Sequence, residues 1–296
     1  MSPSNIKAGL VQHACGHDST DNLAASVNGI EVAAAQGARL VLLQELHRSV
    51  YFCQQEDERC FALAEDIPGE TTDALGKLAA RLDIVIVASL FEQRAPGIYH
   101  NTAVVIETDG SLAGYYRKMH IPDDPGYYEK YYFTPGDLGF TPIKTSLGTL
   151  GVLVCWDQWF PEAARLMALA GAEILLYPTA IGWDDTDTRE EQTRQLDAWL
   201  TIQRSHAISN CLPVMACNRV GFEPATDSGQ GGIRFWGNSC IIGAQGEMLA
   251  RTGSDEPEVL VADIDLSRTA QLRKAWPFFR DRRIDAYADL LKRYRS

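Results

Sequence analysis

Three residues that could together carry out acyl transfer each follow a strand-like run of the sequence. Glu45 follows Leu-Val-Leu-Leu-Gln, Lys118 follows Tyr-Tyr-Arg, and Cys155 follows Gly-Val-Leu-Val. Because ligands in α/β proteins bind at the ends of sheet strands, these side chains are candidates for one site. A thiolate attacks a carbonyl carbon, and a carboxylate can take the thiol proton and pass it to a leaving amine. A neighbouring lysine, and the helix expected directly after Cys155, would favour the thiolate.

Each of the three residues also has a structural interpretation. A cysteine after an apolar strand is commonly a small core residue, a glutamate can cap a helix, and most lysines are solvated surface residues. Residue type and position therefore leave both a catalytic and a structural role open for Glu45, Lys118 and Cys155.

The elements that would position these residues alternate between strand-like and helix-like segments along the chain. Two strand–helix–strand halves, each followed by antiparallel hairpins, predict an α/β fold, a single-domain four-layer α-β-β-α sandwich. We expect that domain over residues 1–267, and over residues 268–296 a basic, aromatic tail that packs on a neighbouring subunit. The predicted helices are 22–36, 71–81, 161–169 and 188–209, and the predicted strands are 6–12, 39–43, 83–90, 102–107, 151–154, 174–177, 214–217, 239–242 and 259–264.

The composition restricts the class of protein. The chain has 296 residues, with 27 Lys and Arg against 39 Asp and Glu, a formal net charge of −12. This charge argues against a nucleic-acid binder or a protein of anionic membrane surfaces, and it is compatible with a cationic small substrate. No apolar run approaches the roughly 20 residues of a membrane span, and residues 1–5 do not resemble a signal peptide. Seven cysteines without a CxxC pair indicate reduced thiols, so we expect a cytoplasmic protein.

Three segments together resemble the nitrilase, or carbon–nitrogen hydrolase, superfamily. They are Leu-Gln-Glu45-Leu, Tyr-Arg-Lys118-Met-His and Val-Cys155-Trp-Asp-Gln-Trp-Phe-Pro-Glu, and they occur in that family's order, 73 and then 37 residues apart. The resemblance implies an αββα sandwich, a Glu–Lys–Cys catalytic triad on these three residues, and no metal or organic cofactor. It also implies a homo-oligomer built from dimers, such as an octamer, assembled through the helix after the cysteine and the C-terminal tail.

The stretch over residues 120–137, HIPDDPGYYEKYYFTPGD, resembles one group within that superfamily. These are the N-carbamoylputrescine amidohydrolases, the ureide hydrolases of the agmatine route to putrescine. Family members carry a second glutamate downstream of the lysine, and Glu129 matches it by position. The alternative for Glu129 is a surface loop carboxylate next to Lys130.

The reaction implied by this resemblance is hydrolysis of N-carbamoylputrescine to putrescine, ammonia and carbon dioxide. Cys155 would attack the ureido carbonyl and carry a thiocarbamoyl intermediate. Glu45 would act as general base and then as general acid. Lys118 and the backbone N–H of Trp156 would stabilise the oxyanion, and Glu129 would hold Lys118 or the substrate nitrogen in place.

The substrate pocket has two interpretations within the superfamily. N-carbamoyl amino-acid hydrolases and ω-amidases bind a carboxylate, and similar enzymes place arginines where this chain has Gln158 and Trp159. An amine-tailed substrate instead needs carboxylates or aromatic rings, because an unpaired buried ammonium is costly. The segment 181–190 supplies both, although its acidic residues are also typical of a solvated helix N-terminus, and the aromatic rings could equally belong to the core. The substrate-binding candidates are Tyr51, Trp159, Trp183, Asp184, Asp185, Asp187 and Glu190.

A non-enzymatic alternative is an inactive nitrilase-fold module used for assembly. Replacement of a triad residue would have favoured it, whereas Glu45, Lys118 and Cys155 are all present. We therefore expect an amidohydrolase that cleaves linear carbon–nitrogen bonds, acts on a small cationic ureide, and binds neither nucleic acid nor membrane.

Overall fold

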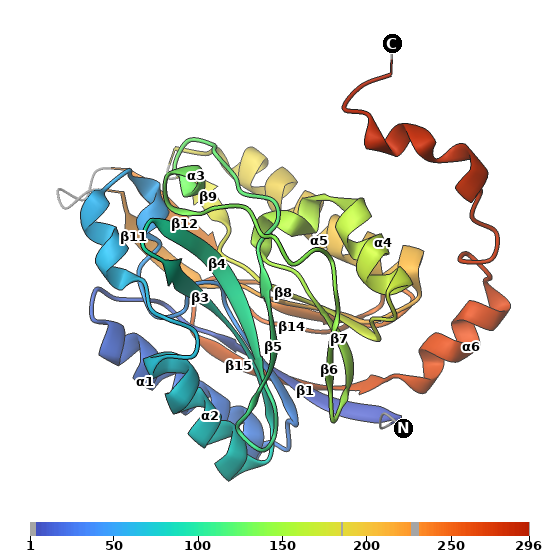
Figure 1. The fold of residues 1–296 in the computed structure, drawn as a ribbon, viewed down its shortest axis with the longest axis horizontal. Coiled ribbons are helices and arrows are strands. Elements are labelled where there is room, and N and C mark those ends of the chain that lie inside the picture. Colours follow the sequence, from blue (N-terminus) through green and yellow to red (C-terminus); the bar gives the residue numbers. More distant parts are fainter. Residues whose placement is uncertain (1–3, 185, 226–230, 296) are drawn as a thin grey trace.

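Two six-stranded sheets form the centre of the molecule (Figure 1). The computed structural model describes residues 4–184, 186–225 and 231–295. The first sheet has the order β15 (Glu258–Asp265), β1 (Asn5–Gln12), β2 (Leu40–Leu43), β3 (Val85–Ala95), β4 (Ile98–Ile106), β5 (Leu112–Arg117). The second has the order β14 (Met248–Arg251), β13 (Cys240–Ile242), β10 (Val214–Cys217), β8 (Ile174–Pro178), β7 (Gly148–Val152), β6 (Ile143–Thr145).

The strand directions bring several strand ends to the same edge. β1, β2 and β3 are mutually parallel in the first sheet, as are β7, β8 and β10 in the second. β3 and β5 both run antiparallel to β4, so β5 ends at the same edge as β2. The two sheets meet at this edge, where the backbone N–H of Glu45 donates to the carbonyl of Thr179, just after β8.

Alternate side chains of the buried strands face two different cores. In β2, Leu40 and Leu42 belong to the core between the two sheets, which also contains Val152 and Leu176. Residues 41 and 43 of the same strand face the other way, into a second core beneath the helices. Helices α1 (Ser19–Ala35) and α2 (Glu70–Leu82) cover the first sheet, and α4 (Pro161–Leu169) and α5 (Arg189–Asn210) cover the second. This arrangement confirms the predicted α-β-β-α sandwich.

The element bounds differ from the prediction mainly at hairpins. β3 continues to Ala95, five residues beyond the predicted strand 83–90. β4 begins at Ile98, four residues before the predicted strand 102–107. Polar residues there end the apolar pattern while backbone pairing continues across the turn. A third, three-stranded sheet was not predicted at all; it consists of β11 (Val220–Pro224), β12 (Gly232–Trp236) and β9 (Gly182–Asp184).

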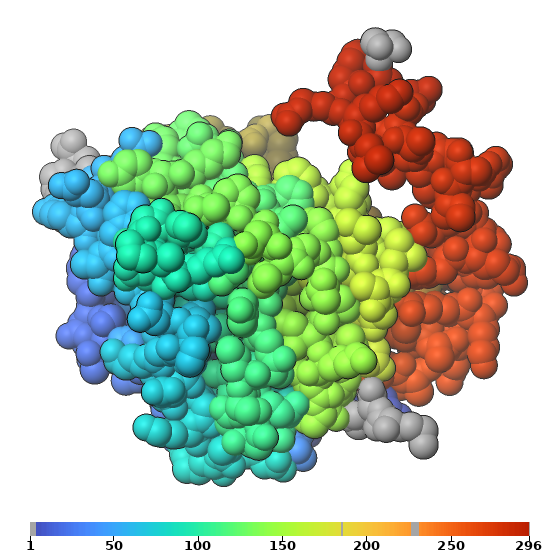
Figure 2. All heavy atoms as spheres, viewed as in Figure 1, coloured from blue at the N-terminus to red at the C-terminus, as the bar shows by residue number. Residues whose placement is uncertain are grey.

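The end of the chain leaves the body of the molecule. Leu272 of α6 (Ser267–Ala275) is still buried against the body, and the ring of Phe279 contacts Arg165 of α4. The residues that follow project from the two-sheet body (Figures 1 and 2). Large apolar side chains among them are exposed, with Leu291 94% and Ile284 74% accessible. None of the helices in the described ranges is long and apolar enough to span a membrane.

Packing of this tail on a neighbouring subunit stays a prediction. We expect that removal of residues 276–296 will lower the number of chains in the assembly, because another copy would cover the exposed apolar side chains of the tail. Light scattering after size exclusion gives the molar mass, and division by the mass of the truncated chain gives this number. An unchanged number of chains would mean that the tail does not hold the assembly together.

Candidate active site

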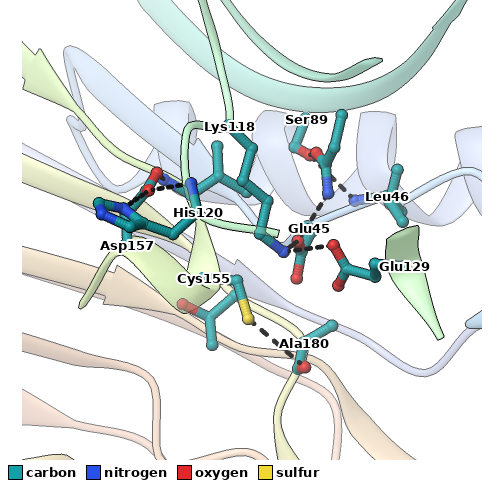
Figure 3. A network of polar contacts seen from close by, with 12 residues as sticks. Glu45, Leu46, Ser89, Lys118, His120, Glu129, Cys155, Asp157 and Ala180 are labelled. Atoms are coloured by element: carbon teal, nitrogen blue, oxygen red, sulfur yellow. Dashed lines mark hydrogen bonds and ion pairs between the residues drawn. The ribbon is translucent and has the colours of Figure 1, made fainter. Parts of the chain in front are cut away.

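Four predicted catalytic residues come together where strands of both sheets end (Figure 3). Glu45 lies two residues beyond β2, Lys118 directly follows β5, and Cys155 lies three residues beyond β7. Glu129 begins the short helix α3 (Glu129–Tyr132). The side chains of Glu45, Lys118 and Glu129 are fully buried, and Cys155 is 5% exposed. The strand ends therefore bring the three triad candidates together, and their catalytic roles stay predictions.

Lys118 lies between the two glutamates. Its Nζ is 2.8 Å from Glu45 Oε1 and 2.6 Å from Glu129 Oε2. Burial disfavours the charge of Lys118, but the two carboxylates outweigh this effect and hold its pKa well above the ordinary value. Lys118 is therefore a permanent cation in the site, suited to stabilise negative charge on a neighbouring atom.

The two glutamates have different partners. Asn101 Nδ2 donates to Glu45 Oε1 at 2.7 Å, while Glu45 Oε2 is buried without a partner in the described ranges. Tyr51 Oη donates to Glu129 Oε1 at 2.6 Å. Burial raises the pKa of Glu129 to about 7, although Lys118 and Tyr51 oppose the rise. Glu45 thus has one oxygen available for a proton, and Glu129 has both oxygens engaged.

Cys155 adopts a strained backbone and holds a neutral thiol. Its φ is +42°, the left-handed region that non-glycine residues rarely adopt. Sγ lies 3.7 Å from the carbonyl oxygen of Ala180. Burial and the charge of Glu45 raise the pKa of the thiol well above its usual value, and Lys118 offsets this only in part. Lys118 therefore favours the thiolate, as expected, but burial and the carboxylates outweigh it, so nucleophilic attack requires a proton acceptor.

Arg219 holds the backbone that carries Glu45. Its Nη2 donates to the carbonyl oxygens of Glu45 and Leu46 at 2.8 and 3.0 Å, and its Nη1 is 2.7 Å from Glu223 Oε1. Sequence reasoning missed Arg219, although it follows the apolar strand β10 closely and the strand-end rule would have found it. It also missed Asn101, which lies inside β4 and carries no such signal.

A cavity of about 320 Å³ opens beside Cys155 and Glu129. Its walls are mainly aromatic and apolar, and besides Glu129 they include one further carboxylate, that of Asp124. The remaining lining residues in the described ranges are Pro122, Pro125, Tyr127, Trp156, Trp159, Ala180, Ile181, Gly182, Gln195, Ala198 and Trp236.

The aromatic substrate-binding candidates take different places around this cavity. Trp159 lines it, together with Trp156, whose backbone N–H stays a predicted oxyanion donor. Tyr51 is not part of the lining, and its Oη donates a hydrogen bond to Glu129. Trp183 is not part of the lining; its ring packs against Trp236, 5.5 Å between centroids, and its Nε1 donates to a carbonyl of α5. Only Trp156 and Trp159 of these residues therefore reach the cavity directly.

The acidic candidates lie further away. Asp184 is exposed and accepts hydrogen bonds from Thr186, and Glu190 is exposed and pairs with Arg194. Asp187 reaches the cavity only indirectly, through a 3.1 Å hydrogen bond from Gln195. Asp185 lies outside the described residues. Sequence reasoning did not single out Asp124, although the segment that contains it had been noted for its resemblance.

Comparisons with known proteins agree with this site. The carbon–nitrogen hydrolase family model matches residues 7–274. N-carbamoylputrescine amidase of Solanum lycopersicum is 43% identical over 97% of this chain and 95% of its own length. Citrullinase of Francisella tularensis subsp. tularensis is 40% identical over 98% of this chain and all of its own. The crystal structure of a carbon–nitrogen hydrolase from Helicobacter pylori G27 superposes with a TM-score of 0.95, at 56% identity, covering 98% of this chain and 100% of that one.

The chain therefore belongs to the carbon–nitrogen hydrolase family, as the resemblance predicted. It is an amidohydrolase with a nitrilase-like sandwich.

The hydrogen bond from Tyr51 gives a test of Glu129. If activity requires ionised Glu129, kcat/KM falls as the pH drops through the pKa of about 7. Tyr51→Phe removes a donor that stabilises the ionised form, so the pKa rises and the acid limb moves to higher pH. A rise of about one would lower kcat/KM at pH 6 by nearly tenfold and leave the value at pH 9 almost unchanged.

Tyr132→Phe is the matched control. Tyr132 also donates a 2.6 Å hydrogen bond, but to the carbonyl of Gln55 rather than to Glu129. Its pH profile should therefore follow the parent enzyme. An unchanged acid limb in Tyr51→Phe would exclude Glu129 as the group that sets it.

Proposed function

We propose that this enzyme hydrolyses N-carbamoylputrescine to putrescine, ammonia and carbon dioxide. The observation that carries the proposal is the charge of the cavity beside Cys155. Asp124 and Glu129 supply two carboxylates, and no lysine or arginine lines the cavity in the described ranges. A cationic ureide fits such a cavity, because an ammonium needs a carboxylate or an aromatic face when it leaves water.

Asp124 is the candidate partner of the distal ammonium. It lines the cavity on an exposed loop, and no hydrogen bond or ion pair engages its carboxylate within the described ranges. The rings of Tyr127, Trp156 and Trp159 line the same cavity and would contact the four-carbon chain of the substrate. N-carbamoylputrescine has an ammonium for the carboxylate of Asp124 and a ureido carbon for the thiol of Cys155.

The alternative substrates all carry a carboxylate. Citrulline, the substrate named for the Francisella relative, has one beside its ammonium, and so do N-carbamoyl amino acids and ω-amides of keto acids. Gln158 stands at a position where carboxylate-binding relatives have arginine. It does not line the cavity, and its Oε1 accepts hydrogen bonds from Trp199 and Gln203. A substrate carboxylate would therefore lack a cationic partner and would face Asp124 and Glu129 instead.

The chemistry follows from the four buried residues. Cys155 Sγ attacks the ureido carbon while its proton moves to Glu45 Oε2, the oxygen without another partner. Lys118 and the backbone N–H of Trp156 stabilise the tetrahedral oxyanion. Glu45 then gives its proton to the terminal amino group of the ureide, which leaves as ammonia as its C–N bond breaks. Water, deprotonated by Glu45, cleaves the thiocarbamoyl group and releases a carbamate that decomposes to amine and carbon dioxide.

Ammonia release tests the substrate assignment. We expect kcat/KM for N-carbamoylputrescine to exceed that for citrulline and for N-carbamoyl-D-phenylalanine by at least about a hundredfold, because a desolvated carboxylate without a partner is rejected strongly. Cys155→Ser supplies the blank. A preference for citrulline would overturn the assignment but keep the chemistry, whereas silence on all three would favour the inactive assembly module.

Asp124→Asn tests the distal ammonium site. We expect KM for N-carbamoylputrescine to rise about three- to tenfold with a smaller change in kcat, since the lost ion pair is partly solvated. N-butylurea, which has no ammonium, should keep its KM. The matched control is Asp123→Asn, which removes an adjacent carboxylate that lies 4.0 Å from Lys130 and does not line the cavity.

Equal KM values in Asp124→Asn and the parent would contradict this site. Alanine variants of Asp184, Asp185, Asp187 and Glu190 then become the next test, because these carboxylates were the first candidates. Among the described ones, Asp187 has the nearest connection to the cavity, through Gln195.

A further inference from the structure

The carboxylate of Asp157 is a buried junction outside the proposed reaction steps. The residue is fully buried and lies two positions after Cys155. Oδ2 accepts hydrogen bonds from Val154 N at 3.0 Å and Tyr116 Oη at 2.8 Å. Oδ1 accepts from His120 N at 3.0 Å and His120 Nδ1 at 2.7 Å, as the dashed lines of Figure 3 show. Both oxygens therefore have two donors each.

These donors frame two triad residues. Val154 immediately precedes Cys155, while Tyr116 and His120 lie two positions before and two positions after Lys118. One carboxylate thus ties the nucleophile turn of the second sheet to both flanks of the lysine from the first sheet.

The Cys155 turn needs such support because its backbone is strained. Asp157 N donates to Val154 O at 3.0 Å while Val154 N donates back to the Asp157 side chain, so the turn is closed reciprocally around Cys155. Without the second bond, the positive φ of Cys155 would depend on backbone bonds alone.

The imidazole of His120 is held from the same side. It stacks on Phe160, with centroids 3.8 Å apart and an interplanar angle of 6°. Phe160 N in turn donates to Asp157 O at 3.1 Å. The segment after Lys118 is therefore held through His120, which contacts both the carboxylate of Asp157 and the ring of Phe160.

We infer that Asp157 is a positioning residue that fixes the Cys155 thiol and the Lys118 ammonium relative to each other. The inference rests on the proposed roles of these two residues in acyl transfer, but not on the identity of the substrate. Oxyanion stabilisation depends on donors held in place before the reaction, so loosening this junction should slow the chemical step.

Asp157→Asn tests the inference. The amide keeps the size of the side chain but offers one accepting oxygen, so two of the four donors lose their partner. We expect kcat to fall about a hundredfold or more, as when an oxyanion donor is lost. KM should stay within about threefold, because Asp157 does not line the cavity. Tyr116→Phe removes one donor and keeps the carboxylate, so it should lose less activity than Asp157→Asn.

Alkylation of Cys155 by iodoacetamide gives a readout that needs no substrate. Lys118 lowers the pKa of this thiol, so a displaced lysine should slow inactivation and move its pH dependence upward. Mass spectrometry identifies the alkylated residue, and circular dichroism gives the fraction of folded enzyme, to which kcat is normalised.

Glu92→Gln is the control for a purely structural loss. Glu92 is also a buried carboxylate, bonded to Arg117 and Thr102, and it contacts neither Cys155 nor His120. We expect lower thermal stability with unchanged kcat and alkylation rate. Equal losses of normalised kcat in both variants, or an Asp157→Asn enzyme with parental kcat and alkylation, would overturn the inference. Ammonia release by Cys155→Ser would instead refute the proposed nucleophile.

Discussion

The buried contact of one ammonium with two carboxylates is the constraint on which the rest of the structure depends. Lys118, Glu45 and Glu129 are all removed from water. Isolated charges are prohibitively costly in such a place, and removing one partner leaves the others uncompensated. The ends of β2 and β5 and the start of α3 must therefore lie within hydrogen-bond distance of one point.

The two-sheet sandwich meets this constraint by placing the carboxyl ends of its parallel strands at one edge. Glu45 and Lys118 come from the first sheet, and Cys155 comes from the second. Contacts across the edge, such as Glu45 N with Thr179 O and Arg219 with the carbonyl of Glu45, fix one sheet against the other. A slip between the layers would separate the thiol of Cys155 from Glu45 and Lys118, its proposed proton acceptor and oxyanion donor.

The sequence predicted the fold and the strand-end residues because both depend on local pattern. Strand-like runs that stop at or just before Glu45, Lys118 and Cys155 mark strands and their ends. The contact of Asn101 with Glu45 depends on the order β2-β3-β4 in the first sheet, and no local pattern encodes the pairing of β2 with β3. The third sheet joins β9 to β12 across about fifty residues of sequence, so the true surroundings of residues 182–184 could not be predicted.

The protonation of Cys155 also depends on contacts with residues distant in the sequence. Nearby features, a lysine and a following helix, favour the thiolate, but burial against two carboxylates reverses the direction. Those carboxylates, with Asp124 at the cavity, leave the site with more negative than positive charge. A cationic substrate reduces this excess on binding, whereas a zwitterion such as citrulline does not. In the proposed function, the carboxylates that keep the thiol neutral at rest would also favour a substrate with an ammonium tail.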